Sequence, residues 1–275
     1  SRVFDFSENI GGRYSLWGPV SISIRIVYGN AVFNEFLAGG AAMDLHALET
    51  DLKNNLPCLL AISDYINLKN DIDVLMLSPY DSRLSLLVPY LQQLWMESLG
   101  KGVTLQGNML NQNCCPILWG DVGTNGQHAF FQMLHQAPAT CAVELLAVKK
   151  PTHDKTQTHQ ILMSHFLAQA QAFSTGKLNT ETEKGIAGIN HKTCPGGRPV
   201  TSMIMDELTP FTLGQLLSMW EHRTAALAAL NNINPFDQWG VELGKEIAQE
   251  LEAPLANPNI PVSDPTTSSL LNALR

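Results

Sequence analysis

The sequence lacks the clusters of positive charge that a nucleic-acid-binding protein needs. Only 15% of its 275 residues are charged, and the formal net charge is −8. Binding to nucleic acid depends on a patch or run of Lys and Arg that faces the phosphates, and no such run is present. We therefore expect no nucleic-acid partner. In an acidic chain an anionic ligand must be held by a few locally placed cations, which makes individual Arg and Lys residues informative.

Long hydrophobic runs are missing as well. No apolar stretch reaches the roughly 18 residues that a membrane-spanning helix needs, and no signal peptide is recognisable. We therefore expect no membrane partner. The chain begins with Ser1, and residues 1–6 read like the middle of a folded unit, so we expect a piece of a longer protein.

Cysteine is scarce, odd in number and without a C-x-x-C pair. The five residues are Cys58, Cys114, Cys115, Cys141 and Cys194. This pattern does not predict a disulfide framework, and it points to a reducing compartment, so we expect a cytoplasmic protein. The adjacent Cys114 and Cys115 are expected to be thiols of the core and of a loop rather than metal ligands.

The hydrophobic residues, 45% of the chain, fall into short strand-like runs that alternate with helical patterns. The expected strands are residues 72–78, 116–119 and 141–148. The expected helices are residues 22–28 and onward, 56–67, 84–100, 127–136, 158–174, 211–230, 237–251 and 268–274. Residues 177–200 are polar and turn-rich and predict a surface connection, and 254–265 predict a Pro-rich loop. This alternation predicts an α/β fold.

Two places in this pattern attract attention before any resemblance is considered. Within 116–136 a strand, a Gly-rich loop and a helix follow one another, which is the arrangement that places ligands at the carboxyl ends of strands in open α/β sheets. The loop at 120–126 lacks the Gly-Lys-Ser/Thr ending of a nucleotide-binding P-loop. At 9–13 a turn contains two glycines, which let the backbone bend tightly and approach a ligand closely.

Five short motifs occur in one order along nearly the whole chain. They are Asn-Ile-Gly-Gly-Arg-Tyr-Ser-Leu-Trp at 9–17, Met-Glu-Ser at 96–98, Gly-Thr-Asn-Gly-Gln-His at 123–128, Thr-Pro-Phe at 209–211, and Phe-Asp-Gln-Trp-Gly-Val-Glu-Leu-Gly-Lys at 236–245. The first and last resemble the two signatures of the phosphoglucose isomerase family. The chain is similar to the C-terminal half of the proteins of that family.

The resemblance implies an αβα sandwich of the sugar isomerase (SIS) type with long flanking helices. Residues 1–30 would end the preceding SIS subdomain, 31–252 would form the C-terminal SIS-type domain, and 253–275 would be a tail with a short helix. The family's loop of Ser and Thr residues that binds the sugar's phosphate lies before the first motif and is absent from this sequence. We therefore expect this chain to be inactive when isolated.

The implied activity is an aldose–ketose isomerisation between glucose 6-phosphate and fructose 6-phosphate, in glycolysis and gluconeogenesis, through an enediol(ate). One base must carry a proton between C2 and C1, and a Glu suits this role. By resemblance this base is Glu97, which by itself reads as a solvated residue at the end of an amphipathic helix. Gln93 lies four residues earlier and shares its helix face, and the family uses the matching Gln as a substrate contact.

By resemblance, Arg13 would stabilise the negative charge of the enediolate, because a guanidinium is always charged and offers fixed donors. Gly12 would lie against the substrate. Without the resemblance, Arg13 reads as a surface Arg in a turn.

Ring opening of the sugar needs an acid–base pair, which the family supplies as a His and a Lys, here His128 and Lys245. The matching His reaches the site from the neighbouring subunit, so the resemblance implies a homodimer with shared active sites. Gln238 would contact the substrate, on the same helix face as Lys245, with Asp237 as the cap of that helix. Without the resemblance, His128 reads as a structural residue at a helix start, and Lys245 as a salt-bridge partner of Glu242.

No metal or organic cofactor is expected for this chemistry. The recurrence of His153, His159 and His165 every six residues puts them on different helix faces, which is poor metal geometry. Two alternatives to an isomerase unit remain open at this point: a non-catalytic SIS module that binds a sugar phosphate, and an isomerase unit fused to another enzyme. An intact set of Arg13, Glu97, His128 and Lys245 argues for catalysis, since a binding module has no need of it.

Overall fold

The computed structural model describes residues 3–177 and 191–274. They form two compact units, Ser1–Pro235 and Phe236–Arg275, which are described separately. The predicted division at 30/31 and 252/253 stays a prediction. In the described ranges no helix is both long and apolar enough to cross a membrane.

The first unit is built on a parallel sheet with the strand order β2-β1-β3-β4. Its strands are β1 (Val74–Pro79), β2 (Ile117–Gly120), β3 (Ala142–Val148) and β4 (Val200–Met205). The first three confirm the predicted strands. β4 was not predicted, because its sequence places Thr and Ser among the apolar residues and its side chains are only partly buried.

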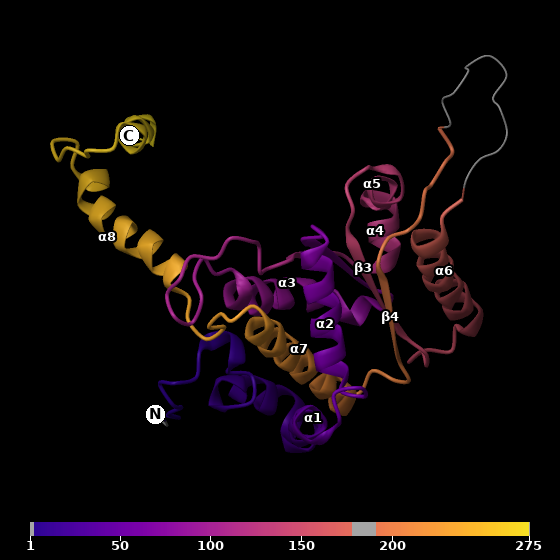
Figure 1. Ribbon diagram of the computed structural model, residues 1–275. Coiled ribbons are helices and arrows are strands. Elements are labelled where there is room, and N and C mark those ends of the chain that lie inside the picture. The colour runs from indigo at the N-terminus through magenta and orange to yellow at the C-terminus, as the bar shows by residue number, and fades with distance from the viewer. Residues whose placement is uncertain (1–2, 178–190, 275) are drawn as a thin grey trace, which may run out of the picture. The chain divides into compact units, whose positions relative to one another are not determined.

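Helices cover both faces of the sheet, which confirms the predicted α/β fold. Figure 1 shows α2 (Leu56–Lys69) and α7 (Pro210–Leu230) on one side of β3 and β4, and α6 (Thr156–Thr175) on the other. Since side chains alternate along a strand, Leu146 and Val148 enter the core formed with α2 and α7, whereas Leu145 and Ala147 enter a second core with α6. Residues 177–200, predicted as a surface connection, include 178–190, which lie outside the described residues, and end at Val200, where β4 begins.

The remaining helices of this unit are α1 (Ile22–Glu49), α3 (Leu87–Gln92), α4 (Gly123–Ala129) and α5 (Phe131–Gln136). α1 is interrupted at Gly29, whose φ of 84° is a conformation that glycine adopts without strain. The predicted helix at 127–136 is in fact divided between α4 and α5, and α4 already starts within the Gly-rich segment. The predicted helix at 84–100 contains a π-helical turn, Gln93–Glu97.

The second unit contains α8 (Glu242–Ala256) and α9 (Pro265–Leu274), preceded by a 3-10 turn, Trp239–Val241. Asp237 does not cap α8, because the 3-10 turn intervenes and the residue before the helix is Val241. Pro254 lies inside α8 rather than in a loop. The predicted final helix is confirmed and starts three residues earlier than expected.

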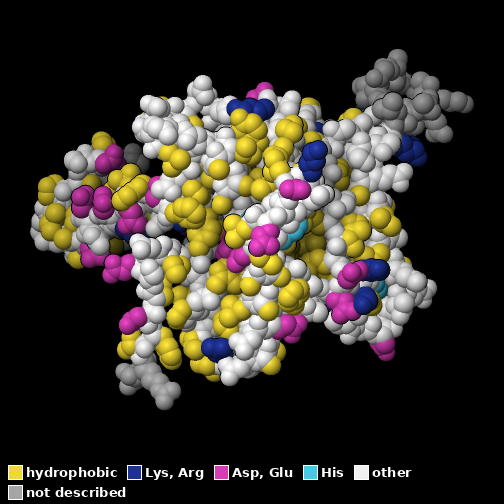
Figure 2. All heavy atoms as spheres, turned by 60° about the horizontal axis from the view of Figure 1, so that its bottom comes forward, with side chains coloured by type: hydrophobic (Ala, Val, Ile, Leu, Met, Phe, Trp, Pro, Cys, Tyr) yellow, Lys and Arg dark blue, Asp and Glu magenta, His cyan; other side chains and the backbone are white. Residues whose placement is uncertain are grey.

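Apolar side chains remain exposed on the first unit. On the face that Figure 2 presents, hydrophobic side chains cover much of the surface and Lys and Arg occur as scattered groups. On α1, the exposed apolar side chains include Ile26, Val27, Tyr28, Leu45 and Leu48. The figure shows no basic patch on this face.

Candidate active site

Arg13 is buried and fixed by three different groups. It lies in the 3-10 turn Gly12–Tyr14, and its side chain is only 3% exposed. Its Nε donates to Ser98 Oγ at 2.7 Å, and its Nη2 donates to the carbonyl oxygen of Pro235 at 2.5 Å. Its Nη1 lies 3.4 Å from Glu97 Oε2. A side chain held at each nitrogen has little freedom, so the guanidinium presents its charge at a defined position.

Ser98 connects this turn to the segment that carries Glu97. Besides accepting from Arg13, its Oγ lies 2.9 Å from the hydroxyl of Tyr14. The Arg13 guanidinium also lies over the Tyr14 ring, 5.5 Å from its centroid. Ser98 is completely buried. Arg13 and Tyr14, which are neighbours in the first segment, therefore both contact Ser98, the residue that follows Glu97 in the second.

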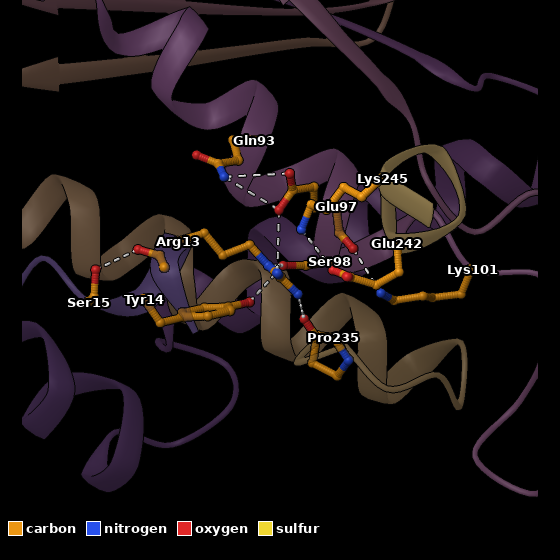
Figure 3. Close-up of polar contacts among 11 residues, drawn as sticks. Arg13, Tyr14, Ser15, Gln93, Glu97, Ser98, Lys101, Pro235, Glu242 and Lys245 are labelled. Carbon is orange, nitrogen blue, oxygen red and sulfur yellow. Dashed lines mark hydrogen bonds and ion pairs between the residues drawn. The ribbon is translucent and has the colours of Figure 1, made fainter. Parts of the chain in front are cut away.

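Glu97 ends the π-helical turn and is partly open, with 30% of its side chain exposed. Gln93 Nε2 lies 3.5 Å from each of its carboxylate oxygens. Its backbone oxygen accepts from Lys101 Nζ at 2.8 Å. Figure 3 shows Gln93 and Arg13 both pointing toward the Glu97 carboxylate. The prediction that Gln93 and Glu97 share a face is thus confirmed, in a turn of the kind often found at functional sites.

The chemistry available here is proton transfer beside a permanent cation. A carboxylate can accept and return a proton, and the guanidinium can stabilise negative charge that develops on a neighbouring oxygen. Because Glu97 is partly open while Arg13 is buried, a ligand would reach the carboxylate first. In the described ranges, no cluster of His, Cys, Asp and Glu is arranged to hold a metal ion.

The glycines of the first motif are not required by their backbone conformation. Gly11 has φ −68° and ψ 153°, which any residue adopts, and Gly12 is not among the residues with positive φ. The expectation of a tight, glycine-dependent bend is therefore wrong. A Cβ atom at Gly12 would meet nothing within 4 Å, so the space beside this residue is open, and the assignment of Gly12 to substrate contact stays a prediction.

His128 is not brought to Arg13 and Glu97 in this structure. The prediction that His128 opens a helix is wrong, because α4 starts at Gly123 and His128 lies in its last turn. Its side chain is exposed, and within the described ranges it shares no hydrogen bond or ion pair with Arg13 or Glu97. In Figure 1, α4 lies beside α5 and apart from α3.

Gln238 and Lys245 belong to the second unit. The prediction that they share a helix face is wrong, because Gln238 precedes the 3-10 turn and only Lys245 is on α8. Lys245 Nζ lies 3.0 Å from Glu242 Oε1, the local salt bridge that its spacing predicts. Its catalytic assignment stays a prediction.

Sequence reasoning overlooked Ser98 and Tyr14 as members of the site. Both lie inside the quoted motifs, next to Glu97 and Arg13, and this adjacency was the available signal. Their link is a contact between segments more than 80 positions apart, which no local pattern reveals.

Comparisons with known proteins identify the family of the chain. The family model described as phosphoglucose isomerase matches residues 1–271. Proteins named glucose-6-phosphate isomerase from Jannaschia sp. and Polaromonas naphthalenivorans are 43% and 44% identical over 100% of this chain, which covers 54% and 51% of their lengths. The crystal structure of a glucose-6-phosphate isomerase from Chlamydia trachomatis matches with a TM-score of 0.88 and 32% identity, over 99% of this chain and 52% of that one.

The chain thus spans about half the length of the relatives it matches, and the match extends through both units. Since the family model covers nearly all of its residues, the chain belongs to the phosphoglucose isomerase family.

Proposed function

We propose that this chain is the C-terminal part of an enzyme that interconverts glucose 6-phosphate and fructose 6-phosphate. The observation that carries the proposal is the placement of the Arg13 guanidinium 3.4 Å from the carboxylate of Glu97, with Ser98 joining the two segments. The names of the relatives support the substrate pair.

In the proposed mechanism, Glu97 removes the proton from C2 of the open-chain aldose, which leaves an enediolate with its negative charge on O1. Glu97 then returns the proton at C1, while the hydroxyl proton of O2 passes to O1 and C2 becomes the carbonyl carbon. Arg13 stabilises the enediolate oxygen, because it is charged in both steps and does not need to move. Gln93, which lies at 3.5 Å from both carboxylate oxygens, keeps the carboxylate oriented and contacts the substrate. No cofactor takes part in these proton transfers.

His128 and Lys245 would open the sugar ring before isomerisation. The exposed position of His128 on α4 supports an action in the site of a neighbouring subunit, because such a residue must project from its own surface. The active form would then be a homodimer in the cytoplasm, with sites shared between subunits. Gln238 and Gly12 would complete the contacts to the sugar.

We expect the chain alone to be inactive, because in the part of it that the structure describes no loop of Ser and Thr residues for the phosphate lies beside the base and the cation. The relatives carry about as many further residues as this chain has, enough for such a loop and the remainder of the enzyme.

The test is a coupled isomerase assay on the longer natural protein and its Glu97→Gln variant. Loss of the base should lower kcat by about a thousandfold or more, or about 4 kcal/mol at 1.36 kcal/mol per decade. Glu35→Gln is the matched control, because Glu35 is an exposed carboxylate on α1.

An active parent, an active control and a nearly inactive Glu97→Gln variant would support the proposal. An inactive parent that still binds the sugar phosphate would favour the SIS binding module instead. A Glu97→Gln variant with full activity would remove Glu97 from the role of base.

A further inference from the structure

A half-buried carboxyl group, that of Glu221, takes no part in the proposed chemistry. Glu221 is on α7, and its Oε2 accepts from Trp17 Nε1 at 2.7 Å. Its other oxygen, Oε1, is buried without a hydrogen-bond partner among the described residues. An unsatisfied buried oxygen is costly, so this group calls for an explanation beyond packing.

Trp17 links Glu221 to the turn that carries Arg13. Its ring stacks on Phe36, with centroids 5.0 Å apart and an interplanar angle of 9°. It also fills the space left by Gly40, where a Cβ atom would come within 2.5 Å of the ring. Between Trp17 and the turn, Ser15 Oγ donates to the carbonyl oxygen of Gly12 at 2.6 Å. A displacement of the Trp17 indole would therefore reach Arg13 through a short segment that this hydrogen bond stiffens.

Two phenols are influenced by the charge of Glu221. Tyr14 reaches Ser98, as described, and Tyr90 on α3 has a buried hydroxyl without a partner in the described ranges. Burial raises the pKa of both phenols, and the negative charge of Glu221 contributes to the rise in each. The carboxyl group of Glu221 is therefore close enough to influence Tyr14, the residue that follows Arg13.

The surroundings of Glu221 disfavour its negative charge. Burial, with a contribution from Asp44 on α1, raises its pKa from 4.5 to about 7, and the hydrogen bond from Trp17 opposes this rise. Asp44 is itself bound by Ser218 and His222, at 2.8 Å each. Asp44, Tyr14 and Tyr90 are the titratable groups that act on Glu221 or feel its charge from the neighbouring elements, and none of these three supplies a positive charge.

We infer that Glu221 is a positioning residue for Arg13: it accepts a hydrogen bond from the Trp17 indole and so holds the segment Gly12–Trp17 in place. This inference rests on the proposed function for its consequence in catalysis. When Glu221 ionises, none of Asp44, Tyr14 and Tyr90 compensates its charge, which favours entry of water and looser packing of the segment Gly12–Trp17. The guanidinium is then less firmly aimed at Glu97.

The first arm of the test uses this chain and does not depend on activity. The indole NH signal of Trp17 and the Nε signal of Arg13 are followed by 15N NMR from pH 5.5 to 8.5, and the variants Trp17→Phe and Arg13→Lys assign them. We expect both signals to shift with one midpoint near pH 7, and the shift to disappear in Glu221→Gln but to remain in Glu35→Gln. The inference would be overturned if neither signal shifted with pH in the unmodified chain, or if the Arg13 signal stayed constant while the Trp17 signal shifted.

The second arm measures kcat and KM against pH in the longer natural protein. If only the neutral acid holds the turn, kcat should fall by up to about tenfold at pH 8 relative to its plateau at lower pH. Glu221→Gln, which keeps an acceptor for Trp17 and carries no charge, should lose this decline. Glu221→Leu should lower kcat at every pH with little change in KM.

An unchanged pH profile in Glu221→Gln together with full activity in Glu221→Leu would contradict the inference. If the natural protein has no isomerase activity at any pH, the proposed function fails. The NMR arm then still decides whether Glu221 controls the position of Arg13.

Discussion

Arg13 and Ser98 lie 85 positions apart in the sequence and are joined by a hydrogen bond of 2.7 Å from Nε to Oγ. This hydrogen bond holds the proposed cation near the proposed base, because Arg13 is the cation and Ser98 directly follows Glu97 in the sequence. It also ties the 3-10 turn Gly12–Tyr14 to the π-helical turn Gln93–Glu97. The relative position of base and cation therefore depends on long-range contacts between two short turns, of which this hydrogen bond is one.

Replacing Arg13 by Lys should preserve the charge and still impair catalysis. A single ammonium group cannot reach Ser98, Glu97 and the Pro235 carbonyl together, as the planar guanidinium does. We expect kcat of the longer natural protein to fall by roughly a hundredfold or more, as for other losses of an oriented transition-state donor. Arg83→Lys, at a partly exposed pair with Asp81, is the control. An Arg13→Lys variant within twofold of the parent would contradict this role.

Replacing Arg223 by Met should destabilise the first unit strongly. Arg223 on α7 is buried and binds Asp64 through Nε and Nη2, at 2.7 and 2.8 Å, and Glu144 through Nη1. Glu144 is completely buried on β3, and its side chain faces the core with α2 and α7 because strand residues alternate. Loss of the cation would leave two buried carboxyl groups without a partner, which costs about 3–5 kcal/mol. Urea unfolding of the chain measures the difference.

A combined replacement separates the effect of charge from that of packing. If Arg223, Asp64 and Glu144 are changed together to Met, Leu and Leu, no unpaired charge remains in the core. We expect the combined variant to be more stable than Arg223→Met alone, because apolar replacement of a whole buried ion cluster is often neutral or stabilising. A combined variant less stable than the single one would show that shape and not charge dominates at this place.

The sequence predicted the interior strands of the fold better than its edge. β1 and β3 read as nearly continuous apolar runs, interrupted by Ser78 and Glu144, because both of their faces are covered by helices. β4 pairs only with β3 and exposes Ser202 and Ile204, so its mixed sequence resembled a loop. The π-helical turn could not be predicted, since the spacing of apolar residues in 84–95 fits a regular helix equally well.

Only those residues of the candidate site that belong to recognisable motifs of the family could be predicted from the sequence. Glu97, Gln93 and Arg13 were assigned by resemblance, and the structure places them together. The roles of Ser98 and Tyr14 depend on a contact between two distant segments, and that of Glu221 depends on burial. The helix start at 237 was predicted wrongly, since Asp237 is a favourable cap residue and the 3-10 turn Trp239–Val241 leaves no local signal.

Adding a methyl group at Gly39 should disrupt the packing of α1 against α7. A Cβ atom there would lie 1.8 Å from the carbonyl oxygen of Phe211, which is backbone and cannot rotate away. We expect Gly39→Ala to cost about 1–3 kcal/mol or more of unfolding free energy, the range for overpacked cores. Gly11→Ala is the matched control: its Cβ meets nothing within 4 Å and its φ is −68°. Equal midpoints of urea unfolding for the two variants would argue against the close approach of these helices.

The thiols should differ widely in their reaction with iodoacetamide at pH 8. Burial raises the pKa of Cys115 to about 12 and that of Cys141 to about 11. Only about one thiol in ten thousand and one in a thousand, respectively, is then in the reactive thiolate form. Burial also raises the pKa of Cys114, whose Sγ donates to the Leu99 carbonyl. Mass spectrometry should therefore find Cys114, Cys115 and Cys141 unmodified in the folded chain.

Cys58 and Cys194 provide the internal comparison, because they are partly exposed, as is Cys115, whereas Cys114 and Cys141 are buried. Cys58 and Cys194 should be labelled first, and all five thiols should react when the chain is unfolded in urea. In Arg223→Met, the loss of stability should bring Cys141 forward in the order of labelling, since this residue lies in the core beside β3. Labelling of Cys115 as fast as that of Cys58 in the folded chain would mean that the segment between α3 and β2 opens frequently, and that the burial described here does not control its reactivity.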